Sequence, residues 1–227
     1  MNRAQMHKEF KLLMDKTGEG GSPSFLSDEI DRFLNIAQDK FVSKRAFGNN
    51  IRRTSFDEDQ KRKDDLRTLI QTEILTEGKT TNISKPNGIT YKLPVNYRHS
   101  INEEALIETF ENNNSARRVG VTPITYDRYN KIVNDPFNTP GKDTVYRLDY
   151  GGASNEHQVE LITGDNQYIV EYHLRYLQSP SEIKEDSQCI LSAHTHREIV
   201  RMAVVDALEN VEQPRYQSSK IELNEME

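Results

Sequence analysis

The sequence predicts an α+β fold, with long N-terminal helices and a C-terminal helix packed together and a central, mostly antiparallel β region. Apolar residues recur at helical spacing in residues 30–41 and again in residues 199–211, which predicts the packed helices. Between them, residues 86–178 contain short alternating segments separated by glycine, proline and asparagine. That pattern is typical of strands and turns.

The length of the chain indicates its organisation. At 227 residues it suits one sizeable domain that can bury a core. We expect a flexible N-terminal arm and linker at residues 1–24, a single domain at residues 25–220 and a C-terminal tail at residues 221–227. Within the domain, the helical part comprises residues 25–78 and 190–212, and the β-rich part comprises residues 86–178.

The composition indicates a lean core. Hydrophobic residues make up 34% of the chain, charged residues make up 29%, and tryptophan is absent. This balance favours surfaces that a partner completes. The single cysteine, Cys189, cannot form an intramolecular disulfide, which suits a reducing compartment. No apolar run approaches the roughly 18 residues of a membrane span, so we expect a soluble protein made in a cytoplasm, with no membrane partner.

The formal charge of −6 is unevenly distributed. Residues 1–80 hold 15 basic and 14 acidic residues, a net charge near +1. Residues 151–227 hold 6 basic and 14 acidic residues, a net charge near −8. An acidic C-terminal third argues against nucleic acid binding tightly to that part of the molecule.

The N-terminal arm is predicted to contain a short helix within residues 2–16, with Met6, Phe10, Leu13 and Met14 on one side. A helix of this length is marginal in isolation, so it needs a docking surface, its own or a neighbour's. Residues 17–24 are rich in glycine and serine and form a linker by composition. The arm is therefore either a disordered tail or a segment that orders on a partner.

Two longer helices are predicted to follow. The first begins near Ser27, has acidic residues in its first turn, where the helix dipole favours anions, and ends around residues 45–48. The second begins at the capping-box pattern of Ser55 and Glu58 and stops at Gly78.

The central region is predicted to consist mostly of strands. Residues 158–163 and 167–176 carry the clearest alternation, and we expect them to pair as a hairpin. Residues 103–111 are predicted to form a helical turn or two, and residues 112–115 a loop. Further strands are predicted at residues 89–93, 119–124 and 144–150, and Thr125 is predicted to cap a short helix that ends at Val133.

The closing helix is predicted within residues 190–212. Ser192 is one candidate N-cap, and Thr195 with Glu198, in capping-box spacing, is another. We expect the apolar stripe of this helix to pack against the first long helix and against the strand at residues 168–176, forming the subunit core.

No group of residues forms a convincing catalytic or metal site. His194 and His196 lie two positions apart and would diverge in a helix, so they cannot easily share a metal ion. Cys189 begins an apolar patch and has the character of a small buried hydrophobe, although a hydrolase built on Cys189 and His194 is a further hypothesis. The sequence contains no Walker-type or dinucleotide-binding loop. We therefore expect no enzymatic activity, no metal and no cofactor.

Three blocks of sequence stand out by their order and spacing along the chain. They are Leu26-Ser27-Asp28-Glu29-Ile30 continuing to Leu34-Asn35-x-Ala37-Gln38, then Val121-Thr122-Pro123-Ile124-Thr125 with Tyr129 and residues 134–140, and finally Tyr172-x-x-Arg175-Tyr176-Leu177-x-x-Pro180-x-x-Ile183 with Cys189, Leu191, His194, Glu198 and Arg215-Tyr216-Gln217. Together they resemble the neck proteins of crAss-like tailed bacteriophages. The blocks extend over about residues 25–220, so the resemblance covers most of the chain.

The resemblance implies a non-enzymatic virion structural protein, a ring-forming adaptor in the head-to-tail connector that joins portal to tail around the DNA channel. It implies a ring of copies of this chain, a dodecamer, with contacts to the portal protein and to other neck or tail proteins. Genomic DNA would pass through the channel without specific binding. The protein would be assembled in the host bacterial cytoplasm and reside in the virion neck, between capsid and tail.

The candidate interface residues lie near the two ends of the chain. Met6 and Phe10 belong to the N-terminal arm. Arg215, Tyr216 and Gln217 follow Pro214, where an arginine–tyrosine pair is a typical interface anchor. The alternative for Tyr216 is that it folds back onto its own core.

The alternative function is a phage DNA-binding regulatory protein that uses the basic clusters in residues 44–63. None of the basic clusters carries the interleaved aromatic residues of a nucleic-acid platform, so solvated faces or protein contacts are favoured. The clusters are Lys44-Arg45, Arg52-Arg53, Lys61-Arg62-Lys63 and Arg117-Arg118.

Overall fold

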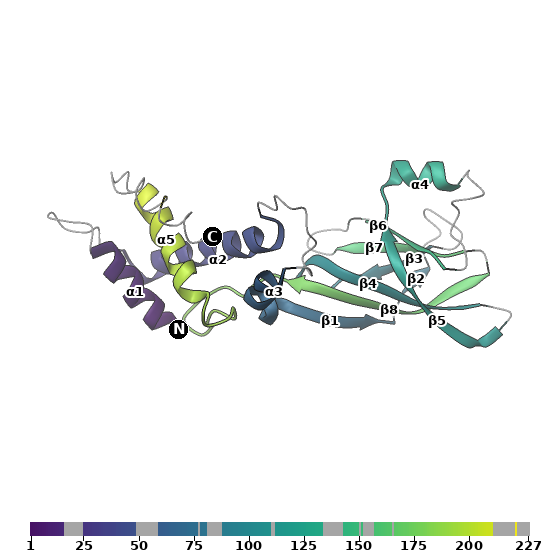
Figure 1. Ribbon diagram of the computed structural model, residues 1–227, viewed down its shortest axis with the longest axis horizontal. Helices are drawn as coiled ribbons and strands as arrows, with labels where there is room; N and C mark the ends of the chain where they lie inside the picture. Colours follow the sequence, from purple (N-terminus) through teal and green to yellow (C-terminus); the bar gives the residue numbers. More distant parts are fainter. Residues whose placement is uncertain are drawn as a thin grey trace. The chain divides into compact units, whose positions relative to one another are not determined.

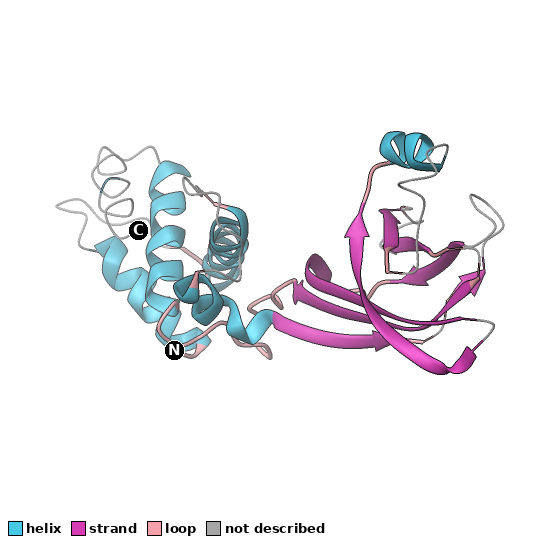
Figure 2. Cartoon of the chain, turned by 45° about the vertical axis from the view of Figure 1, so that its right-hand side comes forward, coloured by secondary structure: helices cyan, strands magenta, loops and turns pink. Residues whose placement is uncertain are grey.

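The computed structural model of the chain describes residues 1–15, 25–48, 59–76, 78–80, 88–109, 112–133, 143–149, 151, 157–164, 166–210 and 221. The chain divides into two compact units. We call residues 1–69 and 180–227 the helical unit and residues 70–179 the β unit. The fold class is α+β, as the sequence predicts, and Figures 1 and 2 show its helices and strands.

The helical unit contains three longer helices and one short one among its described residues. The longer helices are α1 (Arg3–Asp15), α2 (Ser27–Phe47) and α5 (His196–Asn210), and the short one is α3 (Gln60–Leu66). Helix α5 packs against both α1 and α2, so the apolar stripes of the first long helix and the closing helix contact each other. The fully or nearly fully buried side chains are Ile30, Leu34, Ala37 and Phe41 on α2 and Ile199, Val200, Ala203, Ala207 and Leu208 on α5.

Helix α1 docks on the chain's own helical unit. Met6 and Phe10 have no exposed surface. Phe10 contacts Phe25 edge-on, with ring centroids 5.9 Å apart, and stacks with Phe33 at 6.4 Å. Because a 13-residue helix is marginal alone, this apolar contact accounts for its order.

The β unit is an eight-stranded sheet with the order β1-β8-β4-β5-β6-β7-β3-β2. All neighbouring strands are antiparallel except β5 and β6, which are parallel. The strands are β1 (Ile70–Leu75), β2 (Lys79–Thr80), β3 (Gly88–Lys92), β4 (Tyr97–Thr109), β5 (Asn112–Pro123), β6 (Val145–Asp149), β7 (Gln158–Ile162) and β8 (Gln167–Gln178).

Strand β5 pairs with different neighbours along its two parts. Residues 112–120 pair with β4, whereas residues 121–123 pair with β6. Figure 1 labels the long strands β4, β5 and β8 of this unit. Buried side chains from each of the strands β3 to β8 form a cluster that contains Tyr91, Leu161 and Tyr172. The inward face of β8 therefore belongs to a core that the strands of the β unit build among themselves.

The short helix α4 (Tyr126–Val133) begins as the sequence predicts. The hydroxyl of Thr125 accepts a hydrogen bond from the backbone N–H of Arg128 at 3.4 Å, which satisfies one of the free donors of the first turn. Tyr129 is buried against Leu148 and Ile162, so the helix is anchored to β6 and β7.

The second predicted helix is mostly wrong. Helix α3 ends at Leu66, a 3-10 turn covers Arg67–Leu69, and Ile70 begins strand β1. The side chain of Asp59 caps α3, while the predicted Ser55–Glu58 capping box lies outside the described residues. Short apolar runs fit a helix or a strand equally well, and pairing with β8 decides this one.

Two predictions in the middle of the chain are also wrong. Residues 103–109 belong to strand β4, and the predicted loop at residues 112–115 opens strand β5. Glu103, Ala105 and Ile107 all point inward with a period of two. The buried glutamate makes this alternation hard to recognise in the sequence. The ionic partner that allows it to face inward is adjacent only in the folded chain.

The predicted hairpin of residues 158–163 and 167–176 does not form. Both strands exist, as β7 and β8, but they are not neighbours. Strand β7 pairs with β3 and β6, whereas β8 pairs with β1 and β4. The alternation correctly predicts the strands, but it carries no information about partners that are distant in sequence.

The closing helix begins later than the predicted segment, at His196. The Thr195 hydroxyl donates to the carbonyl of Ser192 at 2.9 Å. Glu198 accepts two hydrogen bonds from Arg45 of α2, both at 2.9 Å, instead of completing a capping box. A long-range charged partner therefore replaces the local one.

Candidate assembly surface

The segment that leads from the last strand to the closing helix is held against α2 by side-chain amides. The Asn35 amide donates to the carbonyl of Ile183 at 3.1 Å, and its oxygen accepts from the Ile183 backbone N–H at 2.7 Å. One turn further on, Gln38 donates to the carbonyl of Ser181 at 2.9 Å. Cys189 donates its thiol to the Gln38 oxygen at 3.1 Å. These bonds fix residues 181–189 on the surface of α2.

A groove of about 570 Å³ opens between this segment and α2. Asn35 and Gln38 line it, so its two sides are held together by the hydrogen bonds just described. Ile36 provides an apolar side chain that remains 42% exposed, and Pro180 lines the groove as well. Of the charged lining residues, five are acidic and three are basic: Asp28, Asp31, Asp39, Glu182 and Glu185, and Arg3, Arg32 and Lys184.

An ionic cluster centred on Asp31 forms part of the groove lining. Arg3 donates to both carboxylate oxygens of Asp31, at 2.7 to 3.0 Å, and His7 contacts one of them at 2.7 Å. Burial alone raises the pKa of Asp31, but the hydrogen bonds from Arg3 and His7 outweigh burial and leave the pKa below its ordinary value. The cluster joins α1 to α2 and leaves Asp31 neutralised within the groove.

Two other acidic lining residues keep their charge available. Lys184 is paired with Glu182 at 2.5 Å, and Arg3 with Asp31. Within the described part of the chain, Asp28 and Glu185 form no such ion pair. Acidic residues outnumber basic ones in the lining by five to three. The groove therefore combines an exposed apolar side chain with an excess of negative charge, which suits a ligand that carries an apolar or aromatic group beside a cation.

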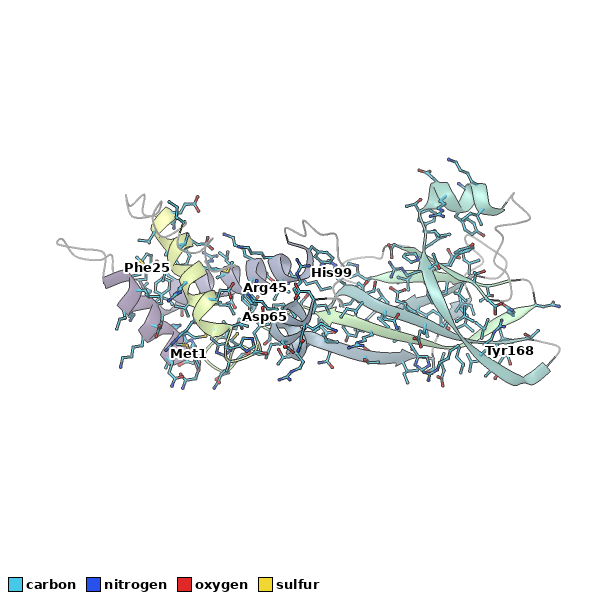
Figure 3. All side chains as sticks on the ribbon, in the orientation of Figure 1. Met1, Phe25, Arg45, Asp65, His99 and Tyr168 are labelled. Atoms are coloured by element: carbon cyan, nitrogen blue, oxygen red, sulfur yellow. The ribbon has the colours of Figure 1, made fainter. Side chains whose placement is uncertain are left out.

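A second ionic cluster contains Arg45 and His194, two residues that the sequence analysis considers as candidates for function. Arg45 lies 2.9 Å from both Asp65 and Glu198, and His194 Nε2 contacts Asp65 at 2.8 Å. Figure 3 labels Arg45 and Asp65, which lie next to each other in the helical unit. The Arg45 side chain is only 12% exposed, so it ties α2 to α3 and α5 and is not presented to nucleic acid.

The other residues considered for metal binding or catalysis are also engaged in structural contacts. His196 Nε2 contacts the carbonyl of Leu191 at 2.8 Å, a different partner from that of His194. Cys189 is buried, and burial raises the pKa of its thiol. No group of three or more metal-ligating side chains occurs among the described residues. None of the helices in the described segments is long and apolar enough to cross a membrane.

A buried charged cluster lies among the described residues of the β unit. Arg147 on β6 forms an ion pair with Glu103 on β4, and the Tyr172 hydroxyl donates to the same carboxylate at 3.0 Å. All three residues are buried, and burial together with Glu103 raises the pKa of Tyr172. The cluster joins three strands inside the unit and is therefore structural.

The predicted interface residues have different locations. Met6 and Phe10 are buried within the helical unit of their own chain, where they hold α1 in place. Arg215, Tyr216 and Gln217 lie outside the described residues, as does the Arg52-Arg53 cluster. Sequence reasoning missed the groove. The spacing of Asn35 and Gln38, two amides three positions apart beside the apolar stripe of α2, is the feature that could have indicated it.

Comparison with known proteins relates most of the chain to bacteriophage proteins. A family model described as phage tail ring protein 3/4 matches residues 1–217. A protein of Bacteroides phage crAss001 named "Ring protein 4/5" is 25% identical over 225 residues, which covers 90% of this chain and 91% of that relative. The match includes the α2 residues and the 180–189 segment that form the groove.

Proposed function

Because the chain belongs to the phage tail ring protein 3/4 family, we propose that it forms a ring in the head-to-tail connector and joins portal to tail around the DNA channel. The observation that carries this proposal is the family match over residues 1–217, which includes both compact units. The ring protein of phage crAss001, related over nearly its full length, supports it.

A ring needs a heterologous contact, in which one surface of a subunit meets a different surface of the next and the rotation closes. The chain suits this role because each unit buries its own apolar side chains, so the subunit can fold before it assembles. The proposed ring is a dodecamer, in line with the resemblance to neck proteins of crAss-like phages. Its proposed neighbours are the portal protein and other neck or tail proteins.

The interface proposal separates two kinds of residue. Met6 and Phe10 have no exposed surface, so they contribute to assembly only by holding α1 in place from inside the helical unit. Arg215, Tyr216 and Gln217 follow the end of α5 and supply the anchor residues. The net charge of −6 suits a channel in which DNA slides, because acidic surfaces repel the phosphate backbone.

Cryo-EM of purified virions tests the proposal. We expect a closed ring between capsid and tail whose density fits the helical and β units of this chain. Particles in which the neck contains no copy of this chain would contradict the proposal. A low-salt gel shift with duplex DNA separates it from the regulatory alternative, which requires binding that weakens steeply as salt rises.

A further inference from the structure

We propose that the groove between α2 and residues 180–185 receives the C-terminal segment of a neighbouring copy, residues 213–220. Tyr216 would lie against Ile36 and Pro180, and Arg215 would face Asp28 and Glu185. This inference rests on the proposed ring and names one contact within it.

The groove is a pre-organised binding site because hydrogen bonds already join its two sides. Asn35 binds both backbone groups of Ile183, and Gln38 binds Ser181 and Cys189. A ligand therefore does not have to order the 181–189 segment when it binds, which lowers the entropic cost of association. A volume of about 570 Å³ lies within the range of pockets that enclose a small ligand and accommodates large side chains.

The proposed occupant matches the groove in charge and shape. Residues 213–220 contain Arg215 and Lys220 and no carboxylate, although the chain as a whole is acidic. The groove presents Asp28 and Glu185 beside an exposed Ile36. Pro214 favours an extended backbone at Gln213, the first residue of this segment. Tyrosine beside arginine combines a rigid apolar surface with a fixed cation.

The length of the segment allows contact with another copy. Seventeen residues follow Asn210, the last residue of α5. The six residues from Asn210 to Tyr216 can span about 20 Å when extended. When the segment of one copy binds the groove of the next, the contact joins two different surfaces and is therefore heterologous, as a closed ring requires.

Cysteine pairs in the full-length chain test this contact. The chain has one native cysteine, Cys189, which is buried and so offers little background. One preparation carries I36C, a second carries Y216C, and a third carries both substitutions. The matched control replaces I36C by L12C, because Leu12 is exposed to a similar extent but does not line the groove.

Under mild oxidation we expect a covalent dimer when the I36C and Y216C preparations are mixed. The double variant should give a ladder of covalent oligomers, and the L12C control should give neither product. An internally cross-linked monomer as the main product of the double variant would overturn the proposal, because it places the segment in the groove of its own chain. Cross-linking no greater than that of the L12C control would also overturn it.

Charge reversal provides a second readout. R215E should weaken self-assembly about tenfold or more, as the loss of an anchor residue does, and E185R should restore assembly when combined with R215E. If R215E assembles at the same protein concentration as the wild type, the proposal is overturned. Native mass spectrometry shows whether the wild type forms rings. If it does and the I36C and Y216C variants do not cross-link, the groove contact is rejected. Virions that lack this ring would instead reject the proposed function.

Discussion

Asn35 and Ile183 are joined by two hydrogen bonds although they are 148 positions apart in the chain. The side-chain amide of Asn35 satisfies both the N–H and the carbonyl of Ile183, as a neighbouring strand would. This pair holds the segment after the β unit against α2 and shapes one side of the groove. Both residues lie in blocks that also support the family resemblance.

Replacement of Asn35 should loosen this segment. Asn35→Ala removes one donor and one acceptor and leaves the Ile183 groups without their partner, so we expect a loss of about 1–3 kcal/mol in the free energy of unfolding. Urea denaturation measures this loss. Asn35→Asp keeps the acceptor for the Ile183 N–H but turns a carboxylate oxygen towards the Ile183 carbonyl, so it should also lose stability. A wild-type unfolding curve for Asn35→Ala would show that the amide does not hold the segment.

The closing helix should tolerate cavities poorly. Leu208 is 1% exposed on α5, so Leu208→Ala should lower the free energy of unfolding by about 2–5 kcal/mol. Leu12→Ala is the matched control, because Leu12 is 49% exposed and its truncation should change stability by less than about 0.5 kcal/mol. Equal losses in the two variants would mean that α5 does not form the core.

Tyr216 should behave in the opposite way to Leu208. Tyr216→Ala should leave the melting temperature of the isolated subunit nearly unchanged and weaken ring assembly, because the side chain is proposed to contact a neighbour. Differential scanning fluorimetry and sedimentation velocity on the same sample separate the two effects. A fall in subunit melting as large as that of Leu208→Ala would assign Tyr216 to the core instead.

The buried ion pair of the β unit should be sensitive to the removal of one partner. Glu103→Ala leaves the buried Arg147 guanidinium with only a longer ionic contact of 3.4 Å to the exposed Asp149, so we expect a loss of about 3–5 kcal/mol. Tyr172→Phe removes only one hydrogen bond to the same carboxylate and should cost about 1 kcal/mol. Chemical denaturation of both variants gives the comparison, and a milder effect for Glu103→Ala than for Tyr172→Phe would refute this account.

His196 should make stability depend on mild acid. Burial lowers the pKa of His196 below its ordinary value of 6.5, so the unfolded chain binds a proton more readily than the folded chain. The stability associated with neutral His196 is therefore fully present above about pH 6.5 and declines as pH falls towards the folded-state pKa. His196→Gln should flatten this part of the curve of unfolding free energy against pH. An unchanged curve would exclude His196 as the source.

The sequence by itself determined the elements whose stabilisation is local. Helix α2 begins at Ser27 as predicted, because acidic residues occupy its first turn and its apolar residues repeat with helical period. Thr125 caps α4 because the bond runs only three residues along the chain. Alternation likewise identified β3 and β6. These features depend on backbone geometry and on side chains within one turn of each other.

Only the tertiary structure decided the features that depend on distant partners. Ile70–Leu75 becomes a strand because β8 pairs with it, and Glu103 can face a core because Arg147 neutralises it. The separation of β7 from β8 follows from the pairing of the whole sheet, and the groove exists because Asn35 and Gln38 hold a segment far along the chain. Local periodicity contains no record of such partners, because the free energy that selects them arises only when remote segments are packed together.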